Sequence, residues 1–297
     1  HREDISGFSL PTWNMEQNDE LLTITTSSLR VIIHKPLWLE WHYKDNAGQW
    51  QELVNDRPTS AYLINAHGDG VAHYQSRRND ERFYGLGDKS GDLQRTGKRY
   101  EMRNLDAMGY NAVSTDPLYK HIPFTITHRS DISFGLFYDN LSNSWLDLGN
   151  EIDNYHTTYR RWQAEAGDID YYLFTGRCVL DITKAFVRLT GKTLFGPKWS
   201  LGYSGSTMHY TDAPDAQNQL MQIIRLCKEH AIPCDSFQLS SGYTSINGKR
   251  YVFNWNYDKV PHPKMMSQEF HNAGIHLAAN IKPCLLQDHP RYNEVAE

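Results

Sequence analysis

The sequence predicts two structural domains: an antiparallel β-sandwich over residues 1–195 and an alternating β/α region with a parallel sheet over residues 196–297. The 297 residues correspond to about two domains at roughly 150 residues each. Short β-branched and aromatic runs separated by turn residues fill the first part of the chain, which is typical of a sandwich. After Pro197, strand-like and helix-like segments alternate, which is typical of a parallel sheet with crossover helices.

The first domain is expected to consist mainly of short strands. Its strand-like runs are apolar, β-branched or alternating, and turn residues separate them. The expected strands are residues 21–25, 29–34, 37–43, 132–138 and 169–174, and the expected turns are residues 46–48, 67–70 and 79–80. A helix is expected over residues 179–189, because apolar residues recur there at helical spacing and Gly191 follows.

The second domain is expected to follow a β-α-β-α-β order. Thr211 or Asp212 can cap its first helix, which runs to His230, and Pro261 or Pro263 opens the second, which ends near Gly274. A loop of about twenty residues precedes that second helix, and loops of this length are usually functional. The expected strands are residues 199–204, 232–239 and 275–281, and the apolar face of the first helix consists of Leu220, Ile223, Ile224 and Cys227.

The composition excludes several classes of protein. Hydrophobic residues make up 39% and charged residues 22%, so a large core can form and intrinsic disorder is excluded. A net charge of −5 without a basic run argues against nucleic-acid binding. No stretch approaches the roughly eighteen apolar residues that cross a bilayer, so a soluble protein without a membrane partner is expected. The 8 Trp, 18 Tyr and 11 Phe fit either core packing or a carbohydrate site.

Neither a metal nor a cofactor is predicted. The histidines form no HExxH pattern, and the cysteines form no CxxC pair and lie at no zinc spacing. Free thiols favour a reducing compartment such as the cytoplasm. Residues 1–25 show no signal peptide, but the chain begins with His1 rather than Met, so the compartment stays open. The sequence does not indicate an oligomeric state. The cysteines are Cys178, Cys227, Cys234 and Cys284.

Three polar segments allow more than one interpretation. Gly85–Asp88 lacks the third glycine and the following helix of a dinucleotide fingerprint, so a tight turn in the sandwich is predicted. Asp106 lies in an irregular stretch that is either a solvated loop or a loop lending its carboxylate to a neighbouring pocket. Ser240–Ser245 follows the second strand of the β/α region, but no Gly-x-Ser-x-Gly motif marks a nucleophile there.

Six motifs follow one another along the chain, from about residue 80 to its end. They are FYGLGD (83–88), NLDA (104–107), TDPLYKHIPF (115–124), FGPKWSLGY (195–203), NWN (254–256) and VPHP (260–263). In this order they resemble glycoside hydrolase family 31, which contains α-glucosidases and α-xylosidases. The resemblance implies a galactose-mutarotase-like β-sandwich followed by an incomplete (β/α)8 TIM barrel, of which residues 196–297 form the first three strands and two helices. Residues 1–80 fit that sandwich by pattern only.

The resemblance also implies a retaining mechanism. One carboxylate attacks the anomeric carbon and a second carboxylic acid protonates the leaving oxygen, with the two roughly 5 Å apart. In the family these residues follow the fourth and sixth barrel strands, whereas the present sequence stops at Glu297, just past the third. Neither catalytic residue is therefore expected within these 297 residues, and none is nominated.

Part of a sugar pocket is expected to remain. By resemblance, Asp106 matches a sandwich-loop aspartate that reaches toward the sugar. Trp255 lies in the long loop above the strand ends and can offer a ring face to a sugar, unless it only packs within its loop. The segment Leu239–Tyr243 matches a stretch where typical α-glucosidases have Asp-x-Asp-Tyr after the leucine, with Ser240 and Gly242 replacing both aspartates. Lys282 stands where many relatives have Asp or Asn, which favours an anionic or unusual sugar unless Lys282 only pairs with a nearby carboxylate. The expected substrate-binding residues are Asp106, Ser240, Ser241, Tyr243, Trp255 and Lys282.

The function implied is that of the N-terminal portion of an α-glucosidase-like glycosidase that hydrolyses or transfers α-linked glycosyl units. Its partners would be an oligosaccharide or glycoside substrate and the remainder of the barrel, and the isolated portion is expected to be inactive. The alternative is a non-catalytic carbohydrate-binding or scaffold module. A reading frame that continues beyond Glu297 into an Asp-bearing fourth strand would favour the enzyme, and a stop codon would favour the module.

Overall fold

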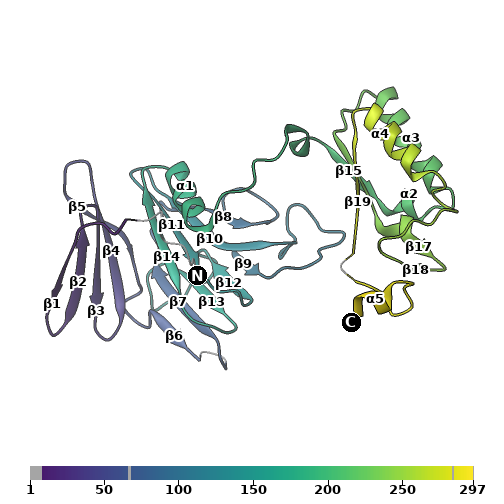
Figure 1. The fold of residues 1–297 in the computed structure, drawn as a ribbon. Helices are drawn as coiled ribbons and strands as arrows, with labels where there is room; N and C mark the ends of the chain where they lie inside the picture. Colours follow the sequence, from purple (N-terminus) through teal and green to yellow (C-terminus); the bar gives the residue numbers. More distant parts are fainter. Residues whose placement is uncertain (1–8, 66–67, 283, 297) are drawn as a thin grey trace. The chain divides into compact units, whose positions relative to one another are not determined.

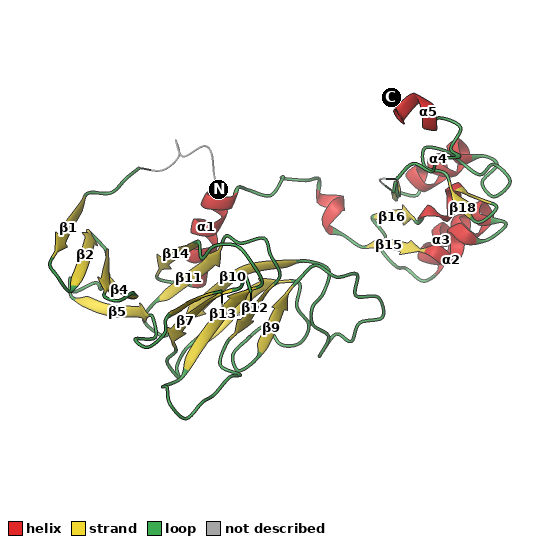
Figure 2. Cartoon of the chain, turned by 90° about the horizontal axis from the view of Figure 1, so that it is seen from below, coloured by secondary structure: helices red, strands yellow, loops and turns green. Residues whose placement is uncertain are grey.

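The chain forms two compact units in the computed structural model, His1–Lys192 and Thr193–Glu297. The structure describes residues 9–65, 68–282 and 284–296. Strands dominate the first unit, whereas helices and short strands alternate in the second (Figures 1 and 2). The predicted order, a sandwich followed by a parallel β/α region, is confirmed. Part of the turn expected at residues 67–70 lies outside the described residues.

The first unit begins with a five-stranded antiparallel sheet in the order β1-β2-β3-β4-β5. The predicted strands at residues 21–25, 29–34 and 37–43 correspond to its three central strands. Asn46–Gly48 forms the predicted turn, in which Gly48 has a φ of 78°. The strands are β1 (Trp13–Gln17), β2 (Leu21–Thr26), β3 (Leu29–His34), β4 (Trp38–Lys44) and β5 (Trp50–Asn55).

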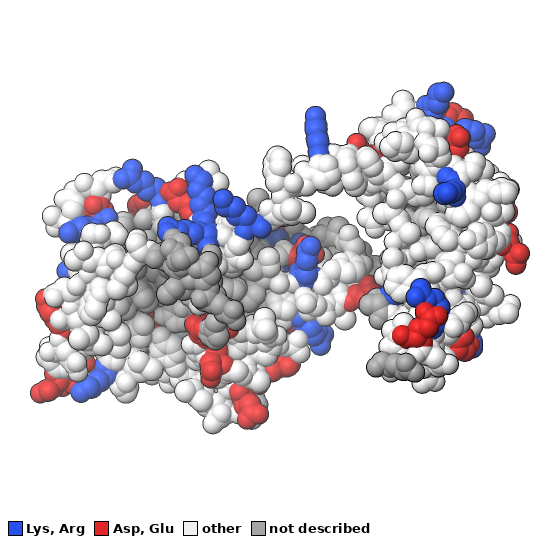
Figure 3. All heavy atoms as spheres, viewed as in Figure 1, with Lys and Arg blue, Asp and Glu red and all other residues white. Residues whose placement is uncertain are grey.

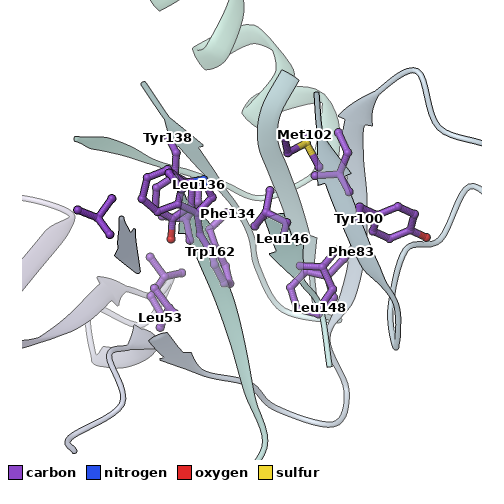
Figure 4. Close-up of a cluster of buried hydrophobic side chains, with 14 of the residues drawn as sticks. Leu53, Phe83, Tyr100, Met102, Phe134, Leu136, Tyr138, Leu146, Leu148 and Trp162 are labelled. Carbon is purple, nitrogen blue, oxygen red and sulfur yellow. The ribbon is translucent and has the colours of Figure 1, made fainter. Parts of the chain in front are cut away.

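Two further antiparallel sheets, in the orders β14-β11-β10-β8 and β6-β7-β13-β12-β9, complete this unit. Their inner faces share one hydrophobic core, in which Phe134 of one sheet and Trp162 of the other are almost fully buried (Figure 4). The strands are β6 (Tyr62–Ile64), β7 (Val71–Ser76), β8 (Arg82–Gly87), β9 (Arg99–Met102), β10 (His121–His128), β11 (Ser133–Tyr138), β12 (Ser144–Asp147), β13 (Tyr159–Ala164) and β14 (Tyr171–Gly176).

The glycines of Gly85–Asp88 do not form the predicted turn. Gly85 and Gly87 lie within β8, with φ angles of 106° and 81°. A β-carbon on Gly85 would lie 2.5 Å from the carbonyl oxygen of Phe124 in β10, and one on Gly87 would lie 2.9 Å from the Ile122 nitrogen. The two glycines therefore allow β10 to approach β8 where their register shifts.

The predicted helix after the sandwich is present as α1 (Val179–Thr190), and Gly191 forms its C-cap. Its buried Ile182 packs with Phe124 and Ile126, and Phe186 stacks on Phe124 with ring centroids 4.0 Å apart. A β-carbon on Gly135 of β11 would lie 2.6 Å from the Ile182 side chain. The helix therefore covers one face of the β14-β11-β10-β8 sheet at close range.

The second unit contains the parallel sheet β15-β16-β19. Leu220, Phe237 and Phe270 belong to its hydrophobic core, and the predicted apolar face of the first long helix is directed toward that core. The elements are a 3₁₀ helix (Lys198–Leu201), β15 (Ser204–Thr207), α2 (Met208–Asp212), α3 (Ala216–Glu229), β16 (Ser236–Leu239), a second 3₁₀ helix (Ser241–Thr244), β17 (Ser245–Ile246), β18 (Lys249–Arg250), α4 (Pro263–Asn272), β19 (His276–Ala279) and α5 (Tyr292–Ala296).

The predicted first strand of this unit was misplaced. Residues 198–201 form a 3₁₀ helix in which the Ser200 hydroxyl donates to the Pro197 carbonyl at 2.7 Å. The strand begins at Ser204, because residues 204–207 pair with residues 236–239. Trp199 and Leu201 are exposed rather than buried. The other two predicted strands, 232–239 and 275–281, shorten to the residues that pair, β16 and β19.

The predicted helix from Thr211 or Asp212 to His230 is divided in two. Pro214 disfavours a helical conformation at the residue before it, and Ala213 is extended with a ψ of 147°. Thr207 caps α2 by accepting from the His209 N–H, and Asp215 is the N-cap residue of α3. The long loop is also structured, because its 3₁₀ turn continues into the β17–β18 hairpin. Pro263 opens α4 as one of the two predicted alternatives.

Candidate functional site

The three parallel strands of the second unit end at one edge of their sheet. Thr207, Leu239 and Ala279, the last residues of β15, β16 and β19, lie in register. The segments that follow therefore begin side by side, and the Asn280 N–H donates to the Leu239 carbonyl at 3.0 Å. In alternating β/α folds this edge carries the binding and catalytic groups.

The segment after β16 makes one tight turn at this edge. Ser240 is half-buried, whereas Ser241 and Tyr243 are buried within the 3₁₀ helix that follows. The Ser241 hydroxyl accepts from Arg250 Nε at 2.9 Å, and the Tyr243 hydroxyl donates to the Asn280 carbonyl at 3.1 Å. Burial raises the pKa of Tyr243, so this phenol stays protonated and keeps the segments after β16 and β19 joined.

Trp255 packs directly on this turn. Its ring lies 4.6 Å from that of Tyr243, at an interplanar angle of 47°, and the Asn256 N–H donates to the Tyr243 carbonyl at 2.9 Å. The ring is half-buried against the hydrophobic cluster of the unit. In this structure Trp255 therefore contributes to the core of its loop, as in the alternative interpretation, and sugar stacking by its ring stays a prediction.

Lys282 lies two residues beyond Asn280 and is exposed. It lines a largely apolar pocket of about 620 Å³ together with Val252, Phe253, Ile281 and Leu285, and His289 closes part of the same pocket. His289 is buried, and its Nε2 lies 2.8 Å from the Val252 carbonyl. Lys282 and Arg291 both line this pocket, and cations in an apolar lining are compatible with an anionic ligand group.

Asp106 belongs to the first unit, whereas the other five predicted residues belong to the second. Its side chain is exposed on the loop between β9 and β10. The buried Lys89 holds this loop by donating to Asp116 Oδ1 at 2.7 Å and to the Glu101 carbonyl, and Asp116 Oδ2 accepts from the Glu101 N–H at 2.6 Å. Burial lowers the pKa of Lys89 although Asp116 opposes this shift. Asp106 is thus presented to solvent by an anchored loop.

Two residues at the sheet edge were missed by sequence reasoning. Asp212, at the end of α2, pairs with Arg250 of β18, whose Nη2 lies 3.2 Å from Asp212 Oδ1 and 3.4 Å from Oδ2. Gly242 lies beside this pair, because an added β-carbon would stand 2.2 Å from Asp212 Oδ1. The only sequence signal at Asp212 was its helix-capping residue type, and Arg250 carried none.

The described residues contain no group of three or more His, Cys, Asp or Glu side chains placed to hold a metal ion. Within the same part of the chain, no helix is long and apolar enough to cross a membrane. All four cysteines are free thiols.

On the face of the second unit drawn in Figure 3, acidic and basic side chains lie in small mixed groups. The side chains described at the sheet edge offer hydrogen bonding through the Ser241 hydroxyl, the Asp212 carboxylate and the Arg250 guanidinium group.

Two protein-family models match successive parts of the chain. The Glycosyl hydrolase 31 N-terminal galactose mutarotase-like domain matches residues 4–147, and the Glycosyl hydrolases family 31 TIM-barrel domain matches residues 193–297. Together they cover most of both units, and they occur in the order that the six motifs implied.

Individual relatives agree with the family models. Alpha-glucosidase 2 of Bacillus thermoamyloliquefaciens is 28% identical over 94% of this chain and 33% of its own length. Neutral alpha-glucosidase AB of Homo sapiens is 26% identical over 82% of this chain and 27% of its own length. A Flavobacterium johnsoniae GH31 dextranase, solved in complex with isomaltotriose, matches with a TM-score of 0.77 and 27% identity, covering 95% of this chain and 32% of the dextranase. The chain thus spans about a third or less of these relatives.

Proposed function

Since the chain belongs to glycoside hydrolase family 31, we infer that it is the N-terminal portion of a retaining α-glycosidase that hydrolyses or transfers α-linked glycosyl units. The observation that carries this proposal is the succession of the two family domains along one chain. The chain spans only about a third of the α-glucosidase to which it is similar. The activity is therefore proposed for the whole enzyme and not for this portion alone.

The proposal assigns the described residues to binding rather than to bond cleavage. The nucleophile and the acid/base would follow the fourth and sixth strands of the barrel, and the structure describes three parallel strands in residues 193–297. Ser240, Ser241 and Tyr243 would form the part of the binding site after β16, and Trp255 packs against Tyr243. Lys282 would add to this binding site from the segment after β19, and a binding role for Asp106 of the first unit stays a prediction.

The substrate is proposed to be an α-linked oligosaccharide or glycoside, and no cofactor takes part. The solved dextranase was complexed with isomaltotriose, which makes α-linked glucosyl units the first substrates to examine. Lys282 is the residue that would favour an anionic sugar, so a glucuronide belongs in the same substrate panel. If Lys282 recognises such a group, Lys282→Ala should lose activity on the uronide and keep it on the neutral glycoside.

The test begins with the complete reading frame that contains this chain. The expressed protein should release nitrophenol from p-nitrophenyl α-glycosides, and NMR of the first product should show the α-anomer, because a double displacement retains configuration. An inverted first product would contradict the retaining mechanism. A purified full-length protein that binds isomaltotriose but cleaves no α-glycoside would instead support the carbohydrate-binding module.

A further inference from the structure

The carboxylate of Asp212 lies in the space that a side chain at position 242 would occupy. An ideal β-carbon built on Gly242 stands 2.2 Å from Asp212 Oδ1 and 2.6 Å from the carbonyl carbon and oxygen of Thr211. These separations are far below any real contact of a β-carbon, so residue 242 cannot carry a side chain while α2 keeps this position. Glycine at position 242 therefore allows the end of α2 to lie against the turn after β16.

Two basic side chains hold Asp212, one at its carboxylate and one at its backbone carbonyl. Arg250 Nη2 approaches both of its oxygens, at 3.2 and 3.4 Å, while Arg250 Nε donates to the Ser241 hydroxyl at 2.9 Å. One guanidinium thus ties the end of α2 to the turn after β16. The Lys259 ammonium also donates to the Asp212 backbone carbonyl at 3.0 Å, which fixes the last residue of the helix.

The same carboxylate remains open to a ligand. The side chain of Asp212 is 44% exposed and that of Arg250 is 35% exposed, so Arg250 does not use up the lone pairs of the carboxylate. A carboxylate has about four acceptor positions, and hydroxyl donors form strong, short bonds to an ionised acceptor. Asp212 ends the helix that directly follows β15, at the same sheet edge as Ser240 and Asn280.

We propose that Asp212 is a substrate-binding, specificity-determining residue that accepts hydrogen bonds from the hydroxyl groups of a neutral sugar, with Arg250 as its positioning residue. This inference rests on the proposed function. It states that the acceptor missing at positions 240 and 242 is supplied from α2 instead. Specificity then depends on the segment after β15, whose carboxylate lies beside the turn after β16.

The experiment compares the full-length protein with its Asp212→Ala variant on a deoxy-substrate series. The probes are p-nitrophenyl α-D-glucopyranoside and its 2-, 3-, 4- and 6-deoxy analogues. In the wild type, removal of the hydroxyl that meets Asp212 should lower kcat/KM about 10- to 100-fold, as expected for a hydrogen bond to a charged group. In Asp212→Ala that penalty should fall below about 2-fold, whereas the penalties for the other hydroxyls should persist.

Controls separate recognition from folding. Asp258→Ala changes an exposed aspartate in the loop before α4 and should leave every deoxy penalty unchanged. Gly242→Ala adds a β-carbon in the space held by Asp212 Oδ1 and should reproduce the loss seen in Asp212→Ala. Arg250→Lys keeps the charge but not both hydrogen bonds, so the deoxy penalty should be reduced and KM should rise more than kcat falls. Identical deoxy penalties in the wild type and Asp212→Ala would overturn the inference.

A binding measurement keeps the inference testable if the proposed function fails. Titration of the wild type and Asp212→Ala with isomaltotriose, followed by calorimetry, requires no turnover. If the wild type binds but cleaves nothing, the enzyme assignment fails while weaker binding by Asp212→Ala still supports the role of Asp212. Equal affinities in the two proteins would contradict that role, and a wild type that neither binds nor cleaves would overturn both proposals.

Discussion

Replacement of Asp56 by alanine should destabilise the sandwich severely. Asp56 follows β5 and is fully buried. Its carboxylate accepts from the Leu39 N–H at 3.0 Å and from the Tyr62 hydroxyl at 2.5 Å, and it lies 2.7 Å from His73 Nε2. These groups come from β4, β6 and β7, so a single carboxylate joins the β1–β5 sheet to the β6-β7-β13-β12-β9 sheet.

The magnitude follows from the groups that Asp56→Ala leaves without a partner. Each buried unsatisfied group costs about 1–3 kcal/mol, and breaking a buried charged network typically costs about 3–5 kcal/mol. His73 cannot turn away, because Tyr62 stacks on its ring at 4.7 Å and its Nδ1 lies 2.9 Å from the Tyr138 hydroxyl. At about 2–4 °C per kcal/mol for a unit of this size, Tm should fall by about 6–20 °C.

Tryptophan fluorescence during thermal unfolding is a suitable assay, because Trp13, Trp38, Trp41, Trp50, Trp145 and Trp162 lie in the first unit and Trp199 and Trp255 in the second. Asp56→Asn keeps one acceptor oxygen and should show an intermediate loss. Asp69→Ala, at an exposed turn position, should change Tm little. A loss below about 1 kcal/mol in Asp56→Ala would refute the reasoning, since the buried donors would then have found other partners.

Three further predictions concern other parts of the chain. Burial raises the pKa of Glu81 above its ordinary 4.5. The protonated carboxyl therefore stabilises the folded state below pH 4.5, and this stability is lost as the pH rises through the folded-state pKa. The Tm of Glu81→Gln relative to wild type should thus increase between pH 4 and pH 8, and a pH-independent difference would count against this prediction. Gly85→Ala should cost at least about 2 kcal/mol in urea unfolding, because its β-carbon meets the Phe124 carbonyl oxygen, whereas Gly48→Ala, with nothing within 4 Å, should cost about 1 kcal/mol; equal costs would show that contact with β10 is unimportant. The purified 297-residue chain should release no nitrophenol from α-glycosides above background, and robust turnover would show that the catalytic carboxylates had been misplaced.

Strands β2, β3 and β4 of the first sheet and the helices α1 and α4 were predictable because their signals are local. Alternation of side chains favours an extended chain with one covered face, and it identified β3 and β4, whereas an apolar, β-branched run identified β2. Pro263 at the first turn of α4 and Gly274 just beyond it, with a φ of 78°, mark the limits of that helix. The β17–β18 hairpin was also encoded locally, by Asn247-Gly248 with φ angles of 49° and 77°, although that signal was overlooked.

The sequence by itself determined those strands, turns and helices whose signals are local, such as β3, β4 and α1, and its motif order indicated the family. Tertiary structure decided where β15 begins, because pairing with residues 236–239 selects residues 204–207. It also brought Asp212 to Arg250, 38 positions away, and to the open space beside Gly242. Local preferences depend on each residue and its neighbours, whereas a close approach between distant segments depends on how whole elements pack. A glycine in the sequence therefore cannot reveal which carboxylate lies next to it.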